Sequence, residues 1–243
     1  MKIEYDDERF FHQYAQMSRS REGLSGAGEW PQLKKLFPDV REKRFLDLGC
    51  GYGWHCMYAA SLGAEQILGI DISARMIEEA VKGNKSEKIT YRVCGLEEYD
   101  YPAESWDCVI SNLTLHYVAD LEDVYRKVYC TLRGGGTFLF NIEHPVYTSG
   151  VGQDWIRDGE GKTLYWPVDD YFYPGERKTK FLGCEVMKQH HTLTQILNGL
   201  LLCGFVLEAV EEAYPSEKML ELPGMKDETR RPMMLLVKAR KPE

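Results

Sequence analysis

Three glycines, each separated from the next by one residue, follow directly after an apolar stretch in the first quarter of the chain. The segment reads Phe45-Leu46-Asp47-Leu48-Gly49-Cys50-Gly51-Tyr52-Gly53, and an amphipathic stretch over residues 56–62 comes next. This order predicts a strand, a tight turn and a helix. Glycines permit positive φ angles and let a ligand approach the backbone, and the amino terminus of the following helix presents free N–H groups. The segment therefore predicts a loop that binds a nucleotide-like cofactor.

The spacing of the glycines separates two kinds of cofactor. A dinucleotide loop of the form G-x-G-x-x-G needs a glycine at position 54, where this chain has Trp54. Residues 47–53, Asp-Leu-Gly-Cys-Gly-Tyr-Gly, instead resemble the first motif of the class I S-adenosylmethionine-dependent methyltransferases, usually (D/E)-x-G-x-G-x-G. The resemblance implies S-adenosylmethionine as the cofactor. An NAD-dependent oxidoreductase and a non-catalytic S-adenosylmethionine-binding sensor are the alternatives.

A second predicted strand, residues 66–72, carries Asp71 near its end. The two vicinal hydroxyls of a ribose are donors that one carboxylate can accept together, so Asp71 is predicted to bind the cofactor ribose. Ser73 follows as a helix cap, and Gly83-Asn84 ends the helix that it starts.

The third predicted strand, residues 88–95, departs from the family pattern at its end. Relatives commonly read Gly-Asp-Ala-Glu there, and the Asp accepts from the adenine amino group, whereas this chain reads Cys94-Gly95-Leu96-Glu97. Gly95 stands in place of that Asp. The contact with the amino group is then expected from backbone, water, Glu97 or Glu98, while Leu96 packs on the ring.

Residues 105–118 resemble the fourth strand of the family and the turn after it. A nearly continuous apolar run suits a central parallel strand that is buried on both faces, and ligands bind at the carboxyl ends of such strands. The resemblance implies that the three glycines shape the loop, that Asp47 supports it, and that apolar side chains border the adenine. The predicted cofactor-binding residues are Tyr14, Asp47, Gly49, Cys50, Gly51, Gly53, Asp71, Ile72, Gly95, Leu96, Glu97, Ser111, Asn112 and Leu113.

Methyl transfer is an in-line displacement, which needs alignment of donor and acceptor in a dry pocket and needs a base only when the nucleophile starts protonated. The candidates for proton transfer are His116, His144 and His191. For His116 the alternative is a packed, hydrogen-bonded residue beneath the site. No metal site is predicted, because the adjacent His190 and His191 point in different directions and Cys184 has no partner at ligand spacing.

The predicted fold class is α/β, a Rossmann-like seven-stranded, mostly parallel sheet with helices on both faces and an antiparallel last strand. One domain, residues 1–243, is expected to contain a helical cap (1–40), a cofactor-binding core (44–142) and an insertion (146–190). The cap is expected to close over the cofactor, with Tyr14 and, with less weight, Arg19 reaching the ligands. The aromatic-rich insertion is interpreted as a substrate lid, with a dimer interface as the alternative.

Charge and cysteine usage limit the partners. A net charge of −8 repels polyanions, and no basic groove is apparent, so a small-molecule acceptor is expected and nucleic acid is not. Seven cysteines without paired spacing indicate free thiols in a reducing compartment. The longest apolar stretch, residues 200–207, is too short to cross a bilayer. The protein is therefore expected to be cytoplasmic, without membrane contact, and a monomer or homodimer.

Overall fold

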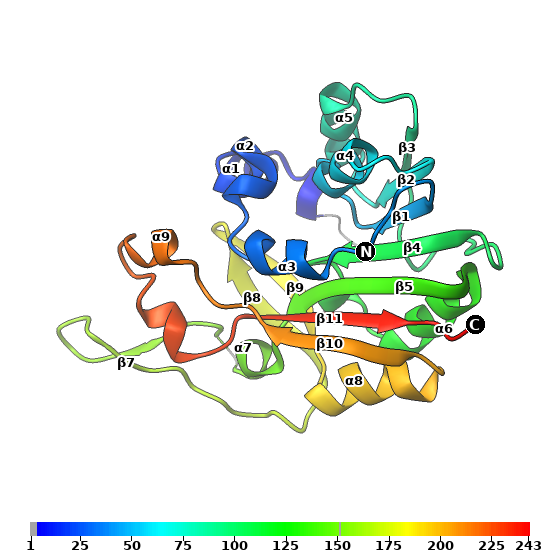
Figure 1. Cartoon of the computed structure of the whole chain (residues 1–243). Coiled ribbons are helices and arrows are strands. Elements are labelled where there is room, and N and C mark those ends of the chain that lie inside the picture. The colour runs from blue at the N-terminus through cyan, green and yellow to red at the C-terminus, as the bar shows by residue number, and fades with distance from the viewer. Residues whose placement is uncertain (1–3, 151) are drawn as a thin grey trace.

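A seven-stranded sheet forms the centre of the computed structural model, which describes residues 4–150 and 152–243 (Figure 1). Residues 1–3 of the predicted cap and residue 151 of the predicted insertion lie outside the described part. The strand order is β10-β11-β5-β4-β1-β2-β3, and β11 is antiparallel to both of its neighbours. The predicted fold class is confirmed. The strands are β1 (Arg44–Leu48), β2 (Gln66–Asp71), β3 (Ile89–Val93), β4 (Trp106–Asn112), β5 (Leu132–Glu143), β10 (Val206–Glu212) and β11 (Met234–Arg240).

Helices cover both faces of this sheet because successive residues of its strands point to opposite sides. In β1, Phe45 packs into the cluster that contains Leu33 of α3, whereas Leu46 packs into the cluster that contains Tyr125 of α6. The helices of the first face are α3 (Trp30–Leu36), α4 (Trp54–Ser61) and α5 (Ala74–Gly83). Those of the second face are α6 (Leu121–Thr131) and α8 (Leu193–Leu202).

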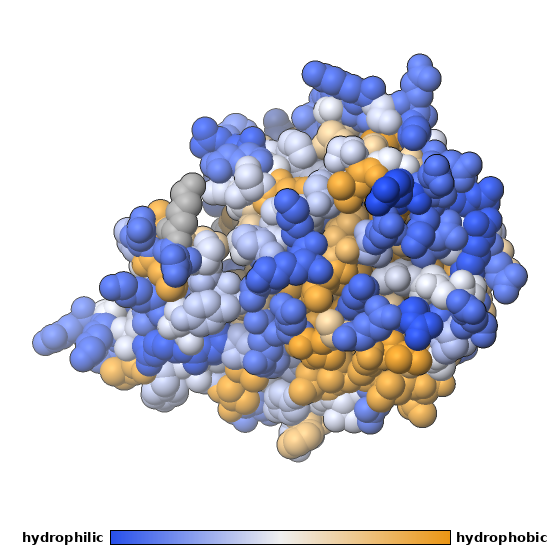
Figure 2. All heavy atoms as spheres, viewed as in Figure 1, coloured by the Kyte–Doolittle hydropathy of each residue, from blue (hydrophilic) through white to orange (hydrophobic). Residues whose placement is uncertain are grey.

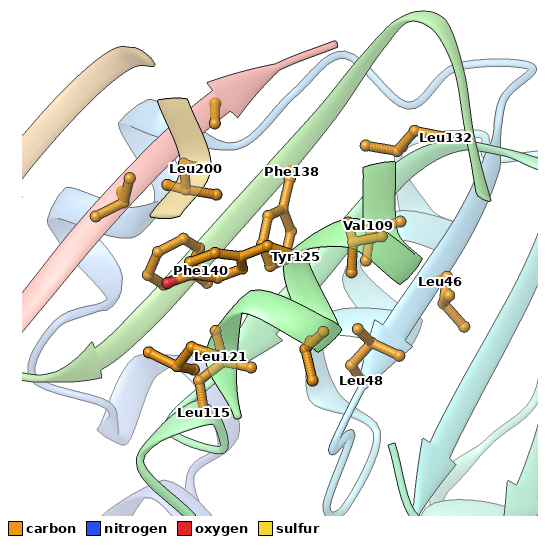
Figure 3. Close-up of a cluster of buried hydrophobic side chains, with 14 of the residues drawn as sticks. Leu46, Leu48, Val109, Leu115, Leu121, Tyr125, Leu132, Phe138, Phe140 and Leu200 are labelled. Atoms are coloured by element: carbon orange, nitrogen blue, oxygen red, sulfur yellow. The ribbon is translucent and has the colours of Figure 1, made fainter. Parts of the chain in front are cut away.

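The core of the second face is aromatic and aliphatic. Figure 3 shows Tyr125 of α6 against Phe138 and Phe140 of β5, with Leu200 of α8 beside them. The rings of Tyr125 and Phe140 are stacked with their centroids 6.0 Å apart. This packing fixes α6 and α8 to the half of the sheet that contains β5, and so fixes the carboxyl end of that strand.

Side-chain caps begin helices α5 and α8. Ser73 Oγ accepts a hydrogen bond from Met76 N at the start of α5, as predicted. Thr192 and Gln195 form a reciprocal capping box at the start of α8.

The amino-terminal segment is helical in short pieces, as predicted for the cap. Asp6 holds this segment to the start of α5, because Asp6 Oδ1 accepts hydrogen bonds from Ser73 Oγ at 2.6 Å and from Arg75 N at 3.3 Å. In Figure 1 these pieces lie at the carboxyl ends of β1 and β4. They are η1 (Glu4–Asp6), α1 (Glu8–Ala15), α2 (Ser18–Arg21) and η2 (Gly23–Gly26).

The predicted insertion contains hairpins and a short helix. Its longest hairpin pairs Gly175 with His190 and Phe181 with Cys184, and the Phe181 ring lies 5.8 Å from the Phe10 ring of α1. The insertion and the cap therefore meet. Its elements are α7 (Pro145–Ser149), β6 (Ile156–Arg157), β7 (Thr163–Tyr165), β8 (Gly175–Phe181) and β9 (Cys184–His190), and the remaining short helices of the chain are η3 (Leu115–Tyr117), α9 (Glu217–Leu220) and η4 (Asp227–Arg230).

The face of the molecule in Figure 2 is mostly hydrophilic. Figure 2 shows hydrophobic residues gathered over the region of α8, where Leu202 is 82% exposed. Within residues 4–150 and 152–243, no helix combines the length and the apolar character that a bilayer crossing requires.

Candidate active site

A cavity of about 510 Å³ lies at the carboxyl ends of the parallel strands. Its walls come from the cap, the glycine loop, the turns after β2, β3 and β4, the end of β5, the β8–β9 hairpin and the start of β11. Open α/β sheets bind ligands at this edge, so the topology and the cavity point to the same site.

The glycine loop leaves open space for a ligand at one position. Gly49, Gly51 and Gly53 have φ angles of 79°, 51° and 75°. A Cβ on Gly49 would collide with the Thr114 side chain, and a Cβ on Gly53 would collide with the Tyr91 hydroxyl. A Cβ on Gly51 would meet nothing within 4 Å among the described residues. Gly49 and Gly53 therefore permit close packing of the protein, whereas Gly51 faces the cavity.

Asp71 stands beside this loop at the end of β2. Its Oδ2 accepts from Gly51 N at 2.9 Å, and its Oδ1 accepts from Ser73 N at 2.9 Å. Burial raises the pKa of Asp71 to about 6, against the opposite effect of the two backbone hydrogen bonds. Each carboxylate oxygen keeps a further lone pair, so the ionised side chain can accept from two vicinal hydroxyls. The empty space at Gly51 and this acceptor pair fit a ribose-containing cofactor.

The part of the cavity that is predicted to bind adenine has an apolar wall with one acidic residue. Ile72, Leu96 and Leu113 line the cavity together with Gly95 and Glu97. Leu113 has a φ angle of 57°, which is uncommon for a non-glycine residue, and its N–H donates to Asn141 O at 2.8 Å. The turn after β4 is thus held by β5.

The structure brings most of the predicted cofactor-binding residues to the cavity. Asp47, Gly53 and Ser111 are not part of its lining. Asp47 is fully buried beneath the loop and accepts from Cys56 Sγ at 3.4 Å, and Ser111 Oγ donates to Leu48 O at 2.9 Å. The residues that do line it are Tyr14, Gly49, Cys50, Gly51, Asp71, Ile72, Gly95, Leu96, Glu97, Asn112 and Leu113.

Of the three candidate histidines, His116 lines the cavity. It is 3% exposed, and burial lowers its pKa to about 4, so its ring is uncharged at neutral pH. His116 Nε2 lies 3.9 Å from Glu143 Oε1.

The other two histidines are engaged elsewhere. His144 Nδ1 accepts from Val146 N at 3.0 Å as the cap of α7, and its Nε2 lies 3.0 Å from Glu212 Oε1. His191 Nε2 lies 2.8 Å from Val118 O. Burial lowers the pKa of both rings. Neither lines the cavity.

A chain of polar side chains positions Arg19 at the cavity wall. Arg19 Nη2 donates to Glu29 Oε2 at 2.9 Å, and Asn112 Nδ2 donates to Glu29 Oε1 at 3.2 Å. Asn141 Nδ2 in turn donates to Asn112 Oδ1 at 2.9 Å. Glu29 is 2% exposed, so this network ties the cap to the ends of β4 and β5. A guanidinium has five donor hydrogens, and those that Glu29 does not use can bind a carboxylate.

The insertion, which was expected to form a substrate lid, and β11, which was not expected at the site, supply further walls of the cavity. Lys188 of β9 forms an ion pair with Glu143 at the end of β5, with 2.5 Å between Nζ and Oε1. The hairpin pattern does not reveal which residue it will pair with 45 positions away. Lining residues outside the predicted set are Tyr5, Met17, Tyr52, His55, Met76, Cys94, Thr114, Tyr117, Val118, Glu143, Tyr147, Glu176, Phe181, Met187, Lys188, Gln189, Met233 and Met234.

Metal ligands do not cluster in the described part of the chain, where no three His, Cys, Asp or Glu side chains are placed to hold an ion together. All seven cysteines, which lie within this part, are free thiols.

Comparisons with known proteins give one consistent class. A family model described as a methyltransferase domain matches residues 46–140. A crystal structure assigned to an S-adenosylmethionine-dependent methyltransferase from Listeria monocytogenes is 46% identical, covers 91% of this chain and 100% of that one, and has a TM-score of 0.87. An S-adenosylmethionine-dependent methyltransferase from Mesorhizobium loti is 41% identical over 90% of this chain and 100% of that one, with a TM-score of 0.83.

Curated relatives differ in how much of their length is matched. An uncharacterized protein from Haemophilus influenzae is 28% identical over 98% of this chain and 97% of that protein. The curated methyltransferases with stated substrates match about half of this chain, and the match covers only about a quarter to a half of their own length.

Proposed function

Because the chain belongs to the class I S-adenosylmethionine-dependent methyltransferases, we propose that it methylates a small molecule held at the far end of the cavity described above. The observation that carries this proposal is the continuity of the cavity. One space runs from Gly51 and Asp71, at the cofactor loop, to Glu143 and Phe181, beneath the cap and the β8–β9 hairpin. A volume of about 510 Å³ lies within the range of about 300–1,000 Å³ that is typical of small-molecule sites.

The residues at the loop end fit the cofactor. Asp71 would accept from the ribose hydroxyls, Ile72 and Leu96 would pack against the adenine, and the free donors of Arg19 would bind the carboxylate of the methionine part. The backbone at Gly51 would lie along the same part of the molecule, since no Cβ intervenes. S-adenosylmethionine, when bound, supplies an electrophilic methyl group.

His116 is the histidine that we propose at the reacting end. Its uncharged ring can accept a hydrogen bond or a proton from the acceptor at neutral pH. His144 and His191 have ring nitrogens engaged outside the cavity, and we propose that they position α7 and the start of α8.

Two observations favour a small acceptor over a macromolecule. The cap and the insertion meet at Phe10 and Phe181 and so cover the cavity, and the net charge of −8 opposes a nucleic acid. The names of partial relatives include arsenite, phosphoethanolamine and protein arginine methyltransferases, so the relatives alone do not select a class. We propose a single cytoplasmic domain, as a monomer or homodimer.

Calorimetric titration of the purified protein with S-adenosylhomocysteine, S-adenosylmethionine and NADH tests the donor site. Both adenosyl compounds are expected to bind. At a ligand concentration of 100 times Kd, each should raise the free energy of unfolding by about 2.7 kcal/mol. Asp71→Asn should weaken S-adenosylhomocysteine binding by about 10- to 150-fold, since hydrogen bonds to a charged group contribute about 1.5–3 kcal/mol. The exposed Asp39→Asn is the matched control and should bind normally. Binding of NADH alone would contradict the proposal.

A further inference from the structure

The end of the cavity opposite the glycine loop contains a buried ion pair. Glu143 is the last residue of β5 and Lys188 lies on β9, and their side chains are 12% and 4% exposed. Lys188 Nζ donates to Glu143 Oε1 at 2.5 Å and lies 3.4 Å from Gln153 Oε1. Both members of the pair line the cavity. Burying an ion costs several kcal/mol even after relaxation, so an ion pair at a cavity wall calls for a functional reason.

The Glu143 carboxylate has acceptor capacity that the protein does not use. An ionised carboxylate offers about four lone-pair sites. Oε1 accepts from Lys188, whereas Oε2 has no hydrogen-bond partner in the part of the chain that the structure describes. Buried acceptors are normally satisfied, so Oε2 is available to accept a hydrogen bond from a molecule bound in the cavity.

The residues around the Glu143–Lys188 pair indicate which other chemical features the bound molecule must have. Lys188 Nζ lies 5.9 Å from the centroid of the Tyr147 ring and 5.4 Å from that of Phe181, and both rings line the cavity, so they suit an apolar or aromatic body. Lys188 is already paired with Glu143, and Arg19, the other cation among the described residues that line the cavity, is paired with Glu29. The cavity therefore offers an anionic ligand no unpaired cation among the described lining residues, which disfavours such a ligand.

We propose that Glu143 and Lys188 form the acceptor subsite and that the subsite selects a small apolar molecule carrying a hydroxyl or amino group. That group donates a hydrogen bond to the Glu143 carboxylate, and Lys188 positions the carboxylate by its ion pair. Molecules that present a carboxylate or a phosphate at the same place are rejected. The proposal rests on the proposed function, because it assigns the acceptor half of the same cavity.

A matched set of ring compounds tests the selection in the wild-type protein. Phenol, aniline, benzoate and phenyl phosphate are each titrated into protein saturated with S-adenosylhomocysteine, and binding is followed by saturation-transfer NMR. We expect phenol and aniline to bind at least tenfold more tightly than the two anions. Equal or tighter binding of benzoate or phenyl phosphate would overturn the proposal.

Variants locate the selection at Glu143. Glu143→Gln should reduce phenol binding at least tenfold while the Kd for S-adenosylhomocysteine stays within about threefold. The control is Glu185→Gln, which changes an exposed residue of β9 that pairs with Lys178. Since Glu143→Gln leaves Lys188 buried without its counter-charge, the double variant Glu143→Gln, Lys188→Met is measured as well and should bind the four probes with similar affinity.

The outcomes separate this inference from the function on which it rests. If wild-type protein fails to bind S-adenosylhomocysteine, the proposed function is wrong. If it binds S-adenosylhomocysteine and either variant keeps the preference for phenol over benzoate, the function stands and the acceptor subsite is wrong.

Discussion

Asp47 is a buried carboxylic acid whose pKa differs from that of an exposed aspartate. It is fully buried beneath the loop, and its Oδ1 has no hydrogen-bond partner within residues 4–150 and 152–243. Burial raises the pKa of Asp47 to about 7, although the hydrogen bond from the Cys56 thiol acts in the opposite direction. The folded protein thus holds a proton on this side chain at pH values at which the unfolded chain has lost it.

The free energy of unfolding should depend on pH because of this proton on Asp47. Between about pH 4 and pH 7 the folded state binds more protons at Asp47 than the unfolded state, so this contribution to the free energy of unfolding falls as the pH rises. Relative to Asp47→Asn, the wild-type protein is expected to lose about 1.4 kcal/mol per pH unit between pH 5 and 6.5 and to level off above pH 8. Urea denaturation at each pH measures the difference.

The exposed Asp39→Asn serves as the control for this series, because its carboxylate is open to solvent. Its difference from wild type should not vary over the same pH range. A flat difference between wild type and Asp47→Asn would contradict the raised pKa. His55 and His116, whose pKa values burial lowers to about 4, act with the opposite sign in both proteins and cancel in the comparison.

Single residues differ in how far the sequence predicts their place. Asp71 and Gly51 lie in a local pattern of strand, turn and helix, so their position at the sheet edge follows from a few neighbouring residues. The pairing of Glu143 with Lys188 depends on how a 45-residue excursion folds back over the sheet. No local pattern carries that information.

The amino-terminal cap supplies part of the cavity wall. Tyr5 of η1 lines the cavity, and its hydroxyl lies 3.1 Å from the Tyr117 hydroxyl of η3. Asp6, the next residue, holds η1 to the first turn of α5 through Ser73 Oγ and Arg75 N. One carboxylate therefore fastens the cap to α5, the helix that follows β2.

Removing this fastening should speed ligand exchange. Asp6→Ala deletes the hydrogen bonds at 2.6 and 3.3 Å, and bonds to a charged group contribute about 1.5–3 kcal/mol. We expect S-adenosylhomocysteine to dissociate about ten times faster or more, with a smaller change in the association rate. Stopped-flow fluorescence measures both rates.

Glu8→Gln changes an exposed charge on the neighbouring helix α1 and is the control for the cap. It should leave dissociation unchanged. If Asp6→Ala releases the ligand at the wild-type rate, the cap does not limit its escape.

Helices and strands were predictable from the sequence where their apolar residues are buried in the core. The apolar run of β1 and the cap at Ser73 depend on local chemistry, and both are present. The insertion was expected as a substrate lid, but its pairing was not predictable, because the less exposed positions of β8 include Arg177 and Thr179 and do not form an apolar stripe. The position of the β8–β9 hairpin depends on the part of the molecule that it covers. The sequence of the hairpin alone does not indicate which part that is.

At the scale of the whole molecule, the insertion is tied to the carboxyl-terminal part of the chain by Arg231. This residue precedes β11 and is 7% exposed, and its guanidinium carbon lies 4.2 Å from the Trp166 ring centroid and 4.7 Å from that of Tyr147. The two rings are themselves stacked 5.1 Å apart. Since Tyr147 lines the cavity and Arg231 lies just before Met233, this contact links the cavity wall to β11.

Arg231→Lys tests whether this contact holds the insertion in place. Lysine keeps the charge but loses the planar group that stacks on the rings, and buried cation–π contacts contribute about 2 kcal/mol. We expect amide hydrogen exchange to rise about tenfold or more over residues 152–170 and to stay unchanged in β1 and β4. Arg240→Lys, on the exposed side of β11, is the control and should leave both regions unchanged. Faster exchange in the central strands as well would show that Arg231 stabilises the whole domain, and unchanged exchange in the insertion would show that the rings hold it without the guanidinium.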